Sequence, residues 1–203
     1  VNQGHCHPRI IKALHDQSAT LTLTSRAFHN NKLGDYLEFT TDYFGFESLL
    51  PMNTGAEGVE TAIKITRKWG HTIKGIPEGQ AQIVVCDNNF HGRTTTIISF
   101  SSDAASKNHF GPHTNGFIHI PFNDTQALAD VLANNPNVAG FLVEPIQGEA
   151  GVYTPDEDFI RKARQLCTDH NVLLIADEIQ TGIGRTGALL AVCGNCSCEA
   201  ACE

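Results

Sequence analysis

Short apolar runs alternate with helical patterns along most of the chain. Residues 172–176 form one such run, which is typical of a strand buried on both faces of a sheet. Further strands are expected at residues 49–52, 81–87, 117–120 and 138–143. Helices are expected from Pro8 and over residues 31–44, 59–69, 125–133 and 155–170. This alternation from about residue 48 onward predicts an α/β fold with a mainly parallel, doubly wound sheet and helices on both faces.

Composition and charge narrow the class of protein. The formal net charge is -8, which favours a soluble acidic protein and argues against a nucleic-acid partner. No apolar run reaches the length of a membrane span, so we expect no membrane partner. The chain starts without Met or a presequence and is expected to be a piece of something longer.

The cysteines raise the question of a metal site. Cys6, Cys86 and Cys167 are scattered, as in a reducing compartment. Four more crowd the last eleven residues: Cys193, Cys196, Cys198 and Cys202. That spacing could bind a metal, or the tail could be non-native with an accidental composition. We favour the second interpretation and expect no metal site, because no second ligand cluster or supporting fold follows.

A glycine turn before the third expected helix is a candidate phosphate site. Gly55 and Ala56 lie between a strand-like run and a helix start, where free backbone N–H groups and the helix dipole can bind a phosphate. The turn lacks the lysine of a P-loop and the spacing of a dinucleotide site, so the phosphate need not belong to a nucleotide. An ordinary strand-to-helix turn is the alternative.

The turn after residues 81–87 carries Phe90, His91 and Arg93. An aromatic side chain there can stack on a flat ring, and an arginine can bind a carboxylate through two hydrogen bonds. Taken singly, Phe90 also suits the core, and Arg93 also suits a surface ion pair.

Carboxylates close the last two expected strands. Glu144 follows residues 138–143, with Glu149 shortly after it, and Asp177 follows residues 172–176. A carboxylate there needs a cationic or hydrogen-bonding partner, although a strand-end Asp can also cap the next turn. Ligands of open α/β sheets bind at the carboxyl ends of the strands. A phosphate cradle, a flat aromatic and these acids together suit pyridoxal 5'-phosphate, whose ring nitrogen an aspartate keeps protonated.

The sequence resembles the class III, subgroup II, pyridoxal-phosphate-dependent aminotransferases of fold type I. The resemblance covers residues 1–187 and rests on these stretches: VNQGHCHP, LTLTSRAFHNN, LPMNTGAEGVETAIK, NFHGRT, FGP, VEPIQGEAGV and LLIADEIQTGIGRTG. It implies an N-terminal helical and loop segment at residues 1–47, a partial cofactor-binding large domain at residues 48–187, and a Cys-rich tail outside the family at residues 188–203.

The resemblance also implies a reaction and partners. The stretches LTSRAF, MNTG and EPIQGEAGV favour members that move the δ-amino group of ornithine to 2-oxoglutarate, giving glutamate semialdehyde and glutamate. Members that use acetylornithine, 4-aminobutyrate or lysine are the alternative. The expected assembly is a homodimer or a higher homo-oligomer. The expected compartment is the cytoplasm, with the mitochondrial matrix as the alternative.

Cofactor roles follow from the resemblance at matching positions. Gly55 and Ala56 would bind the phosphate through backbone N–H groups. Phe90 would stack on one face of the pyridine ring, and Ile179 would lie against the other. Asp177 would pair with the ring nitrogen.

The remaining roles concern the cofactor's edge and the substrate. Gln180 would hydrogen-bond the phenolic oxygen of the cofactor, and Glu144 would lie beside the cofactor in a supporting role. Arg93 would bind a substrate carboxylate. Glu149 would pair with an arginine from the C-terminal part of the family's proteins, so that one site accepts both ornithine and glutamate.

The departures from the family concern catalysis. Counted from Gln180, the family's Schiff-base lysine falls beyond Glu203, and no lysine follows Lys162. The tyrosine-bearing N-terminal arm and the partner subunit's phosphate-binding Ser or Thr are missing too. We therefore expect a truncated chain that contains no catalytic residue and is inactive by itself. A non-catalytic binding or interaction fragment is the rival interpretation.

Overall fold

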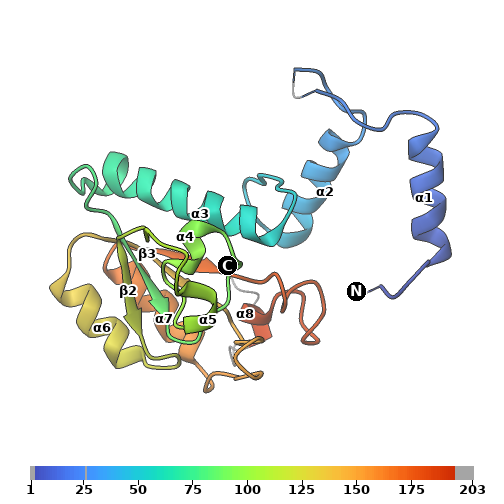
Figure 1. Cartoon of the computed structure of the whole chain (residues 1–203). Coiled ribbons are helices and arrows are strands. Elements are labelled where there is room, and N and C mark those ends of the chain that lie inside the picture. Colours follow the sequence, from blue (N-terminus) through green and yellow to red (C-terminus); the bar gives the residue numbers. More distant parts are fainter. Residues whose placement is uncertain (1–2, 26, 195–203) are drawn as a thin grey trace. The chain divides into compact units, whose positions relative to one another are not determined.

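A computed structural model describes residues 3–25 and 27–194 of the chain (Figure 1). The chain divides into two compact units, Val1–Pro51 and Met52–Glu203. The division into residues 1–47, 48–187 and 188–203 that the sequence suggests stays a prediction.

The first unit contains two helices, α1 (Pro8–Ser18) and α2 (Leu33–Phe44). Pro8 suits the first turn of α1 because that turn has no use for a backbone N–H. Helix α2 ends at Gly45, whose φ of 71° is the left-handed conformation that glycine adopts freely. Both helices were expected from the sequence. Neither contains a buried residue.

The strand expected at residues 49–52 is wrong. The structure has no strand there, and Leu50 is 60% exposed. A strand exists only where its backbone pairs with a neighbour, and Pro51 has no N–H to offer. A short apolar run was therefore a poor guide at this position.

The second unit is built on a four-stranded sheet in the order β2-β1-β3-β4. Its strands are β1 (Gln82–Cys86), β2 (Phe117–Ile120), β3 (Val138–Val143) and β4 (Leu173–Ala176). All three pairings are parallel. Every residue of β3, the strand between β1 and β4, is buried, which explains its uninterrupted apolar sequence. The expected parallel sheet is confirmed.

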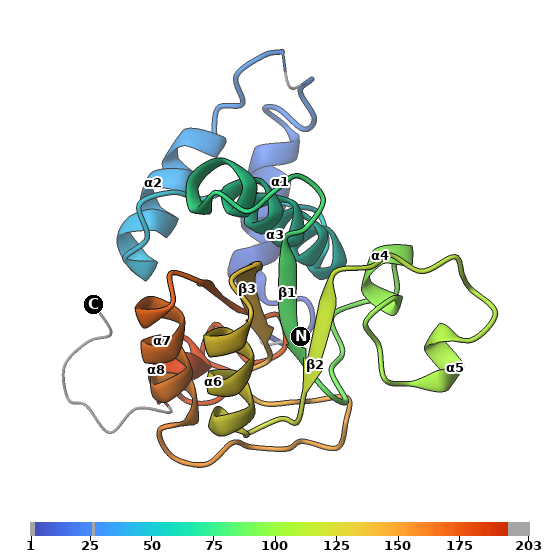
Figure 2. The ribbon, with the colours of Figure 1, turned by 90° about the vertical axis from the view of Figure 1, so that its left-hand side faces the viewer.

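Helices cover both faces of the sheet. Ile83 and Val85 of β1 belong to the core beneath α3 (Gly55–Trp69) and α4 (Thr95–Ile98). The alternate residues Val84 and Cys86 belong to the core beneath α6 (Thr125–Asn134) and α7 (Phe159–Asp169). Helices α6 and α7 lie side by side (Figure 2). This alternation confirms the doubly wound α/β architecture.

Some element bounds and several short elements differ from expectation. Helix α7 begins at Phe159 rather than at residue 155, because Asp158 has a φ of 74° and so cannot continue a right-handed helix. Helix α3 begins earlier than expected, at Gly55. Three short elements were missed: the π-helix η1 (Gly70–Lys74), α4 and α5 (Ala104–Lys107). Such short helices carry too few residues to show a periodic apolar pattern.

The first part of the Cys-rich tail expected at residues 188–203 is packed against the rest of the second unit. Ala191 begins the short helix α8 (Ala191–Gly194) and is only 2% exposed. The N–H groups of Ala191 and Val192 donate to the Glu178 carboxylate at 3.0 and 2.9 Å. Cys196, Cys198 and Cys202 lie outside the described residues.

The described residues offer neither a metal site nor a membrane span. No group of His, Cys, Asp and Glu side chains in this part of the chain could hold a metal ion. No described helix is long and apolar enough to cross a membrane.

Candidate active site

The carboxyl ends of β1, β3 and β4 meet at one edge of the sheet, as parallel pairing requires. Val143 pairs with Ala176, so the next residues, Glu144 and Asp177, are neighbours at that edge. A cavity of about 200 Å³ opens there. Its lining includes all seven residues expected to bind the cofactor: Gly55, Ala56, Phe90, Glu144, Asp177, Ile179 and Gln180. We call this space the first cavity.

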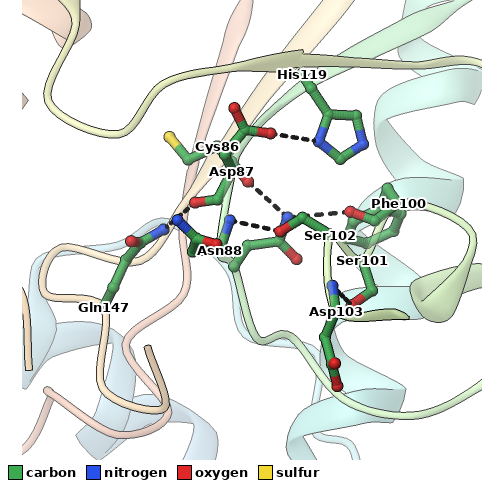
Figure 3. Close-up of polar contacts among 10 residues, drawn as sticks. Cys86, Asp87, Asn88, Phe100, Ser101, Ser102, Asp103, His119 and Gln147 are labelled. Atoms are coloured by element: carbon green, nitrogen blue, oxygen red, sulfur yellow. Dashed lines mark hydrogen bonds and ion pairs between the residues drawn. The ribbon is translucent and has the colours of Figure 1, made fainter. Parts of the chain in front are cut away.

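The loop after β1 is fixed by a network of polar contacts (Figure 3). The Asn88 N–H donates to Ser102 Oγ at 2.7 Å, and Gln147 Nε2 donates to the Asp87 carbonyl at 2.8 Å. The buried Asn89 amide donates to the Cys86 carbonyl at 2.6 Å. These bonds attach the loop to β1 and to two neighbouring loops. The following residues, Phe90 and His91, are thereby held at the first cavity.

His91 is a site residue that sequence reasoning missed. Its Nδ1 lies 2.7 Å from Oδ2 of Asp177, and the two side chains are 0% and 7% exposed. The His91 Nε2 atom is buried and has no hydrogen-bond partner among the described residues. Asp177 therefore meets an imidazole from the loop after β1. One feature of the sequence could have indicated this role. His91 follows Phe90 on a loop that was expected to reach the same sheet edge as Asp177.

Glu144 is another buried acid of the first cavity. It is 5% exposed and accepts the Phe90 N–H at 2.9 Å. Burial raises the pKa of the Glu144 carboxyl, and the negative charge of nearby Asp177 adds to the rise. The backbone N–H of Phe90, the imidazole of His91 and the backbone N–H of Gly148 act in the opposite direction.

The start of α3 forms another side of the first cavity. Thr54 caps the helix by accepting the Glu57 N–H at 3.1 Å, while the Glu57 carboxylate accepts the Thr54 N–H at 3.0 Å. This capping box uses neither the Gly55 nor the Ala56 N–H. Both of those groups lie in the first helical turn, where the helix dipole favours an anion.

A side chain at position 55 would require the Ile179 side chain to shift. A Cβ added to Gly55 would lie 3.0 Å from both Cγ atoms of Ile179, which is closer than side chains normally pack. The Ile179 side chain therefore lies against the helix start and narrows the first cavity from the side of β4.

Arg93 and Glu149 line a second cavity of about 360 Å³. The two cavities adjoin, because Phe90, His91 and Gly92 line both. The Arg93 guanidinium carbon lies 5.5 Å from the centre of the Phe90 ring. The two residues expected to meet the substrate thus lie together, beside the residues expected to meet the cofactor.

The first cavity has the groups that pyridoxal phosphate requires. It offers an N-terminal helix turn for a phosphate, an aromatic ring and a branched apolar side chain for a planar ring, and a carboxylate for a ring nitrogen. None of its described lining residues is a lysine. These residues fit the cofactor, while the covalent attachment point is not among them.

Known proteins support this chemistry. The mitochondrial ornithine aminotransferase of Rattus norvegicus is 56% identical over 192 residues, which cover 95% of this chain and 44% of the rat protein. The ornithine aminotransferase of Toxoplasma gondii, solved with partial occupancy of PLP at its active site, matches with a TM-score of 0.91 and 51% identity over 93% of this chain and 44% of its own. The chain thus spans less than half the length of these relatives.

A third relative is named after a different substrate. The structure of acetylornithine aminotransferase from Elizabethkingia anophelis matches with a TM-score of 0.81 and 59% identity over 94% of this chain and 46% of its own. The family model of class-III aminotransferases matches residues 1–196 and so extends past Gly187. With its strand-end acids, its glycine turn and this match over nearly its whole length, the chain belongs to the class-III aminotransferase family.

Proposed function

We propose that the complete protein is an ornithine aminotransferase. It moves the δ-amino group of ornithine to 2-oxoglutarate with the help of pyridoxal phosphate, and it works as a homodimer or a higher homo-oligomer. The observation that carries this proposal is the pair of adjoining cavities. One is lined by the seven expected cofactor residues, and the other is lined by Arg93 and Glu149.

The first cavity is proposed to hold the cofactor. The Gly55 and Ala56 N–H groups bind its phosphate, and Phe90 and Ile179 enclose its ring. Asp177, oriented by His91 at 2.7 Å, holds a proton on the ring nitrogen. Gln180 donates to the phenolic oxygen, and Glu144 supports the wall beside Phe90. When bound, pyridoxal phosphate supplies an electron sink for the substrate's amino-bearing carbon.

The second cavity is proposed to orient the substrates. Arg93 binds a carboxylate of 2-oxoglutarate or ornithine, and a guanidinium can do so with two parallel hydrogen bonds. Glu149 lines the same cavity and gives it a negative group. Its role of pairing with an arginine from the C-terminal part of the protein is a proposal that rests on the family. For the compartment we propose the cytoplasm or the mitochondrial matrix, and the name of the rat relative calls that protein mitochondrial.

Acetylornithine is the second candidate amino donor, because the Elizabethkingia anophelis relative is 59% identical. The test is to supply the complete protein with pyridoxal phosphate, 2-oxoglutarate and either ornithine or N-acetylornithine, and to measure kcat/KM for each donor. A higher value for ornithine supports the main proposal, and a higher value for N-acetylornithine supports the alternative. No glutamate formation with either donor contradicts both.

A further inference from the structure

Glu178 lies within the segment that follows β4 at the edge of the first cavity. Four of the five residues 177–181 line that cavity: Asp177, Ile179, Gln180 and Thr181. The Glu178 side chain is partly buried, and its carboxylate accepts hydrogen bonds from three donors. These are the N–H groups of Ala191 and Val192, at 3.0 and 2.9 Å, and the hydroxyl of Thr181, at 2.5 Å. One acidic group thus joins two separate segments of the chain.

The segment that donates the two N–H groups is anchored in the core. Ala191 is only 2% exposed, and Val192 packs against the core beneath α6 and α7. The loop that leads to this segment is closed by the Ile183 N–H, which donates to the Leu189 carbonyl at 2.8 Å. Because the core holds Ala191 and Val192, they give the Glu178 carboxylate a fixed point of attachment.

The backbone also turns tightly at Glu178. The Gly182 N–H donates to the Glu178 carbonyl at 2.8 Å, and a Cβ added to Gly182 would lie 2.9 Å from that carbonyl oxygen. Ile179 and Gln180 lie inside this turn, so their positions follow the position of Glu178. A partly buried carboxylate is costly without donors, and hydrogen bonds to a charged group are stronger than neutral ones. The three donors therefore favour one position of the whole turn.

We infer that Glu178 is a positioning residue for the cofactor. Its carboxylate ties the turn that carries Ile179 and Gln180 to the anchored residues Ala191 and Val192, and so fixes one wall of the first cavity. The side chains of Ile179 and Gln180 are exposed, so their own packing does little to hold them. The inference rests on the proposed function, because it takes the first cavity as the site of pyridoxal phosphate.

The direct test is Glu178→Gln in the complete protein. The amide has nearly the size of the carboxylate, but it is neutral and its NH2 group cannot accept a hydrogen bond. The Kd for pyridoxal phosphate, measured by absorbance titration of the apoprotein, should rise about tenfold, the scale of one hydrogen bond to a charged group. The visible circular dichroism of the bound cofactor at saturation should fall, because the ring is held less firmly. Glu157→Gln neutralises an exposed carboxylate of the second unit and is the matched control. It should change neither quantity.

A second control separates positioning from a general loss of stability. Leu132→Ala removes a buried side chain from the core beneath α6, so it should lower the urea midpoint of the complete protein. Under conditions where the variant stays folded, its Kd and circular dichroism should match the wild type. Equal changes in Leu132→Ala and Glu178→Gln would overturn the inference. If Glu178→Gln does not fold, Thr181→Val removes one of the three donors and should raise the Kd by a smaller factor. An unchanged Kd in that variant would then contradict the inference.

Hydrogen exchange decides the inference without the cofactor. In the apoprotein of Glu178→Gln, the amides of residues 179–182 should exchange faster than in the wild type, together with those of Ala191 and Val192. Faster exchange at Ala191 and Val192 alone would show that Glu178 fixes only the start of α8, and the inference would be wrong. A complete wild-type protein that binds no pyridoxal phosphate instead contradicts the proposed function. The exchange at residues 179–182 then still reports on Glu178.

Discussion

Nδ1 of His91 and Oδ2 of Asp177 lie 2.7 Å apart, in side chains that are almost completely buried. His91 belongs to the loop after β1, whereas Asp177 ends β4, and β3 separates these two strands in the sheet. The contact therefore joins two walls of the first cavity across the central strand. Within residues 3–25 and 27–194, the His91 Nε2 has no hydrogen-bond partner, so Asp177 is the polar contact that holds the imidazole there.

Replacing His91 should destabilise the second unit. In His91→Phe the buried Asp177 carboxylate loses a partner, and the free energy of unfolding should fall by about 2 kcal/mol. Equilibrium urea unfolding of the 203-residue chain measures this change. The matched control is His119→Phe, which breaks the more exposed contact between His119 and Asp87 at 3.1 Å (Figure 3). That change should cost less than about 1 kcal/mol. Equal costs for the two variants would contradict a special role for the buried pair.

Glu144 should make stability depend on pH. The pKa of Glu144 is raised in the folded protein, chiefly by burial, so the folded state binds its proton more tightly than the unfolded state does. Ionisation of Glu144 therefore destabilises the fold as the pH rises from 4.5, the ordinary pKa of a glutamate, through the raised pKa of the folded protein. Gln at this position keeps an acceptor for the Phe90 N–H but cannot ionise. Urea unfolding at several pH values should show Glu144→Gln gaining stability over the wild type as pH increases. Parallel pH profiles would contradict this prediction.

Much of the fold could be predicted from the sequence because parallel strands follow a simple geometrical rule. Each buried strand of an open α/β sheet places its carboxyl end at the same edge. The residues after β1, β3 and β4 could therefore be expected to meet, and Phe90, Glu144 and Asp177 do line one cavity. The turn at Gly55 was expected at the same site because it begins a helix on one face of that sheet.

Other features depend on contacts that a local pattern does not encode. His91 looked like one more polar loop residue, and only the folded chain brings its Nδ1 to Asp177. The sequence suggested no role for Glu178. Its carboxylate accepts hydrogen bonds from the N–H groups of Ala191 and Val192 and so fixes the start of the tail. The space at Gly148 is likewise set by Gln180, which lies far along the sequence.

Arg93 should act on the substrate rather than on the cofactor. In the complete protein, Arg93→Ala should lower kcat/KM for 2-oxoglutarate by at least about thirtyfold, because a desolvated arginine–carboxylate contact is typically worth more than about 2 kcal/mol. The affinity for pyridoxal phosphate, measured by absorbance titration, should stay the same. Arg164→Ala on the exposed side of α7 is the control and should change neither quantity. A loss of cofactor affinity equal to the loss of kcat/KM would contradict this division between the cavities.

Residues 1–203 by themselves should show no transaminase activity. Transamination requires an amine that attaches the cofactor and then moves a proton between the substrate carbon and the cofactor. In the part of the chain that the structure describes, no lysine lines the first cavity. Lys162, the last lysine in the sequence, belongs to α7. The chain is purified, given excess pyridoxal phosphate, ornithine and 2-oxoglutarate, and assayed for glutamate semialdehyde against free cofactor. Borohydride treatment followed by peptide mass analysis should find no single lysine that carries the cofactor. Turnover above the background, or one specifically labelled lysine, would show that a residue of this chain takes the amine's role and that the site is assigned wrongly.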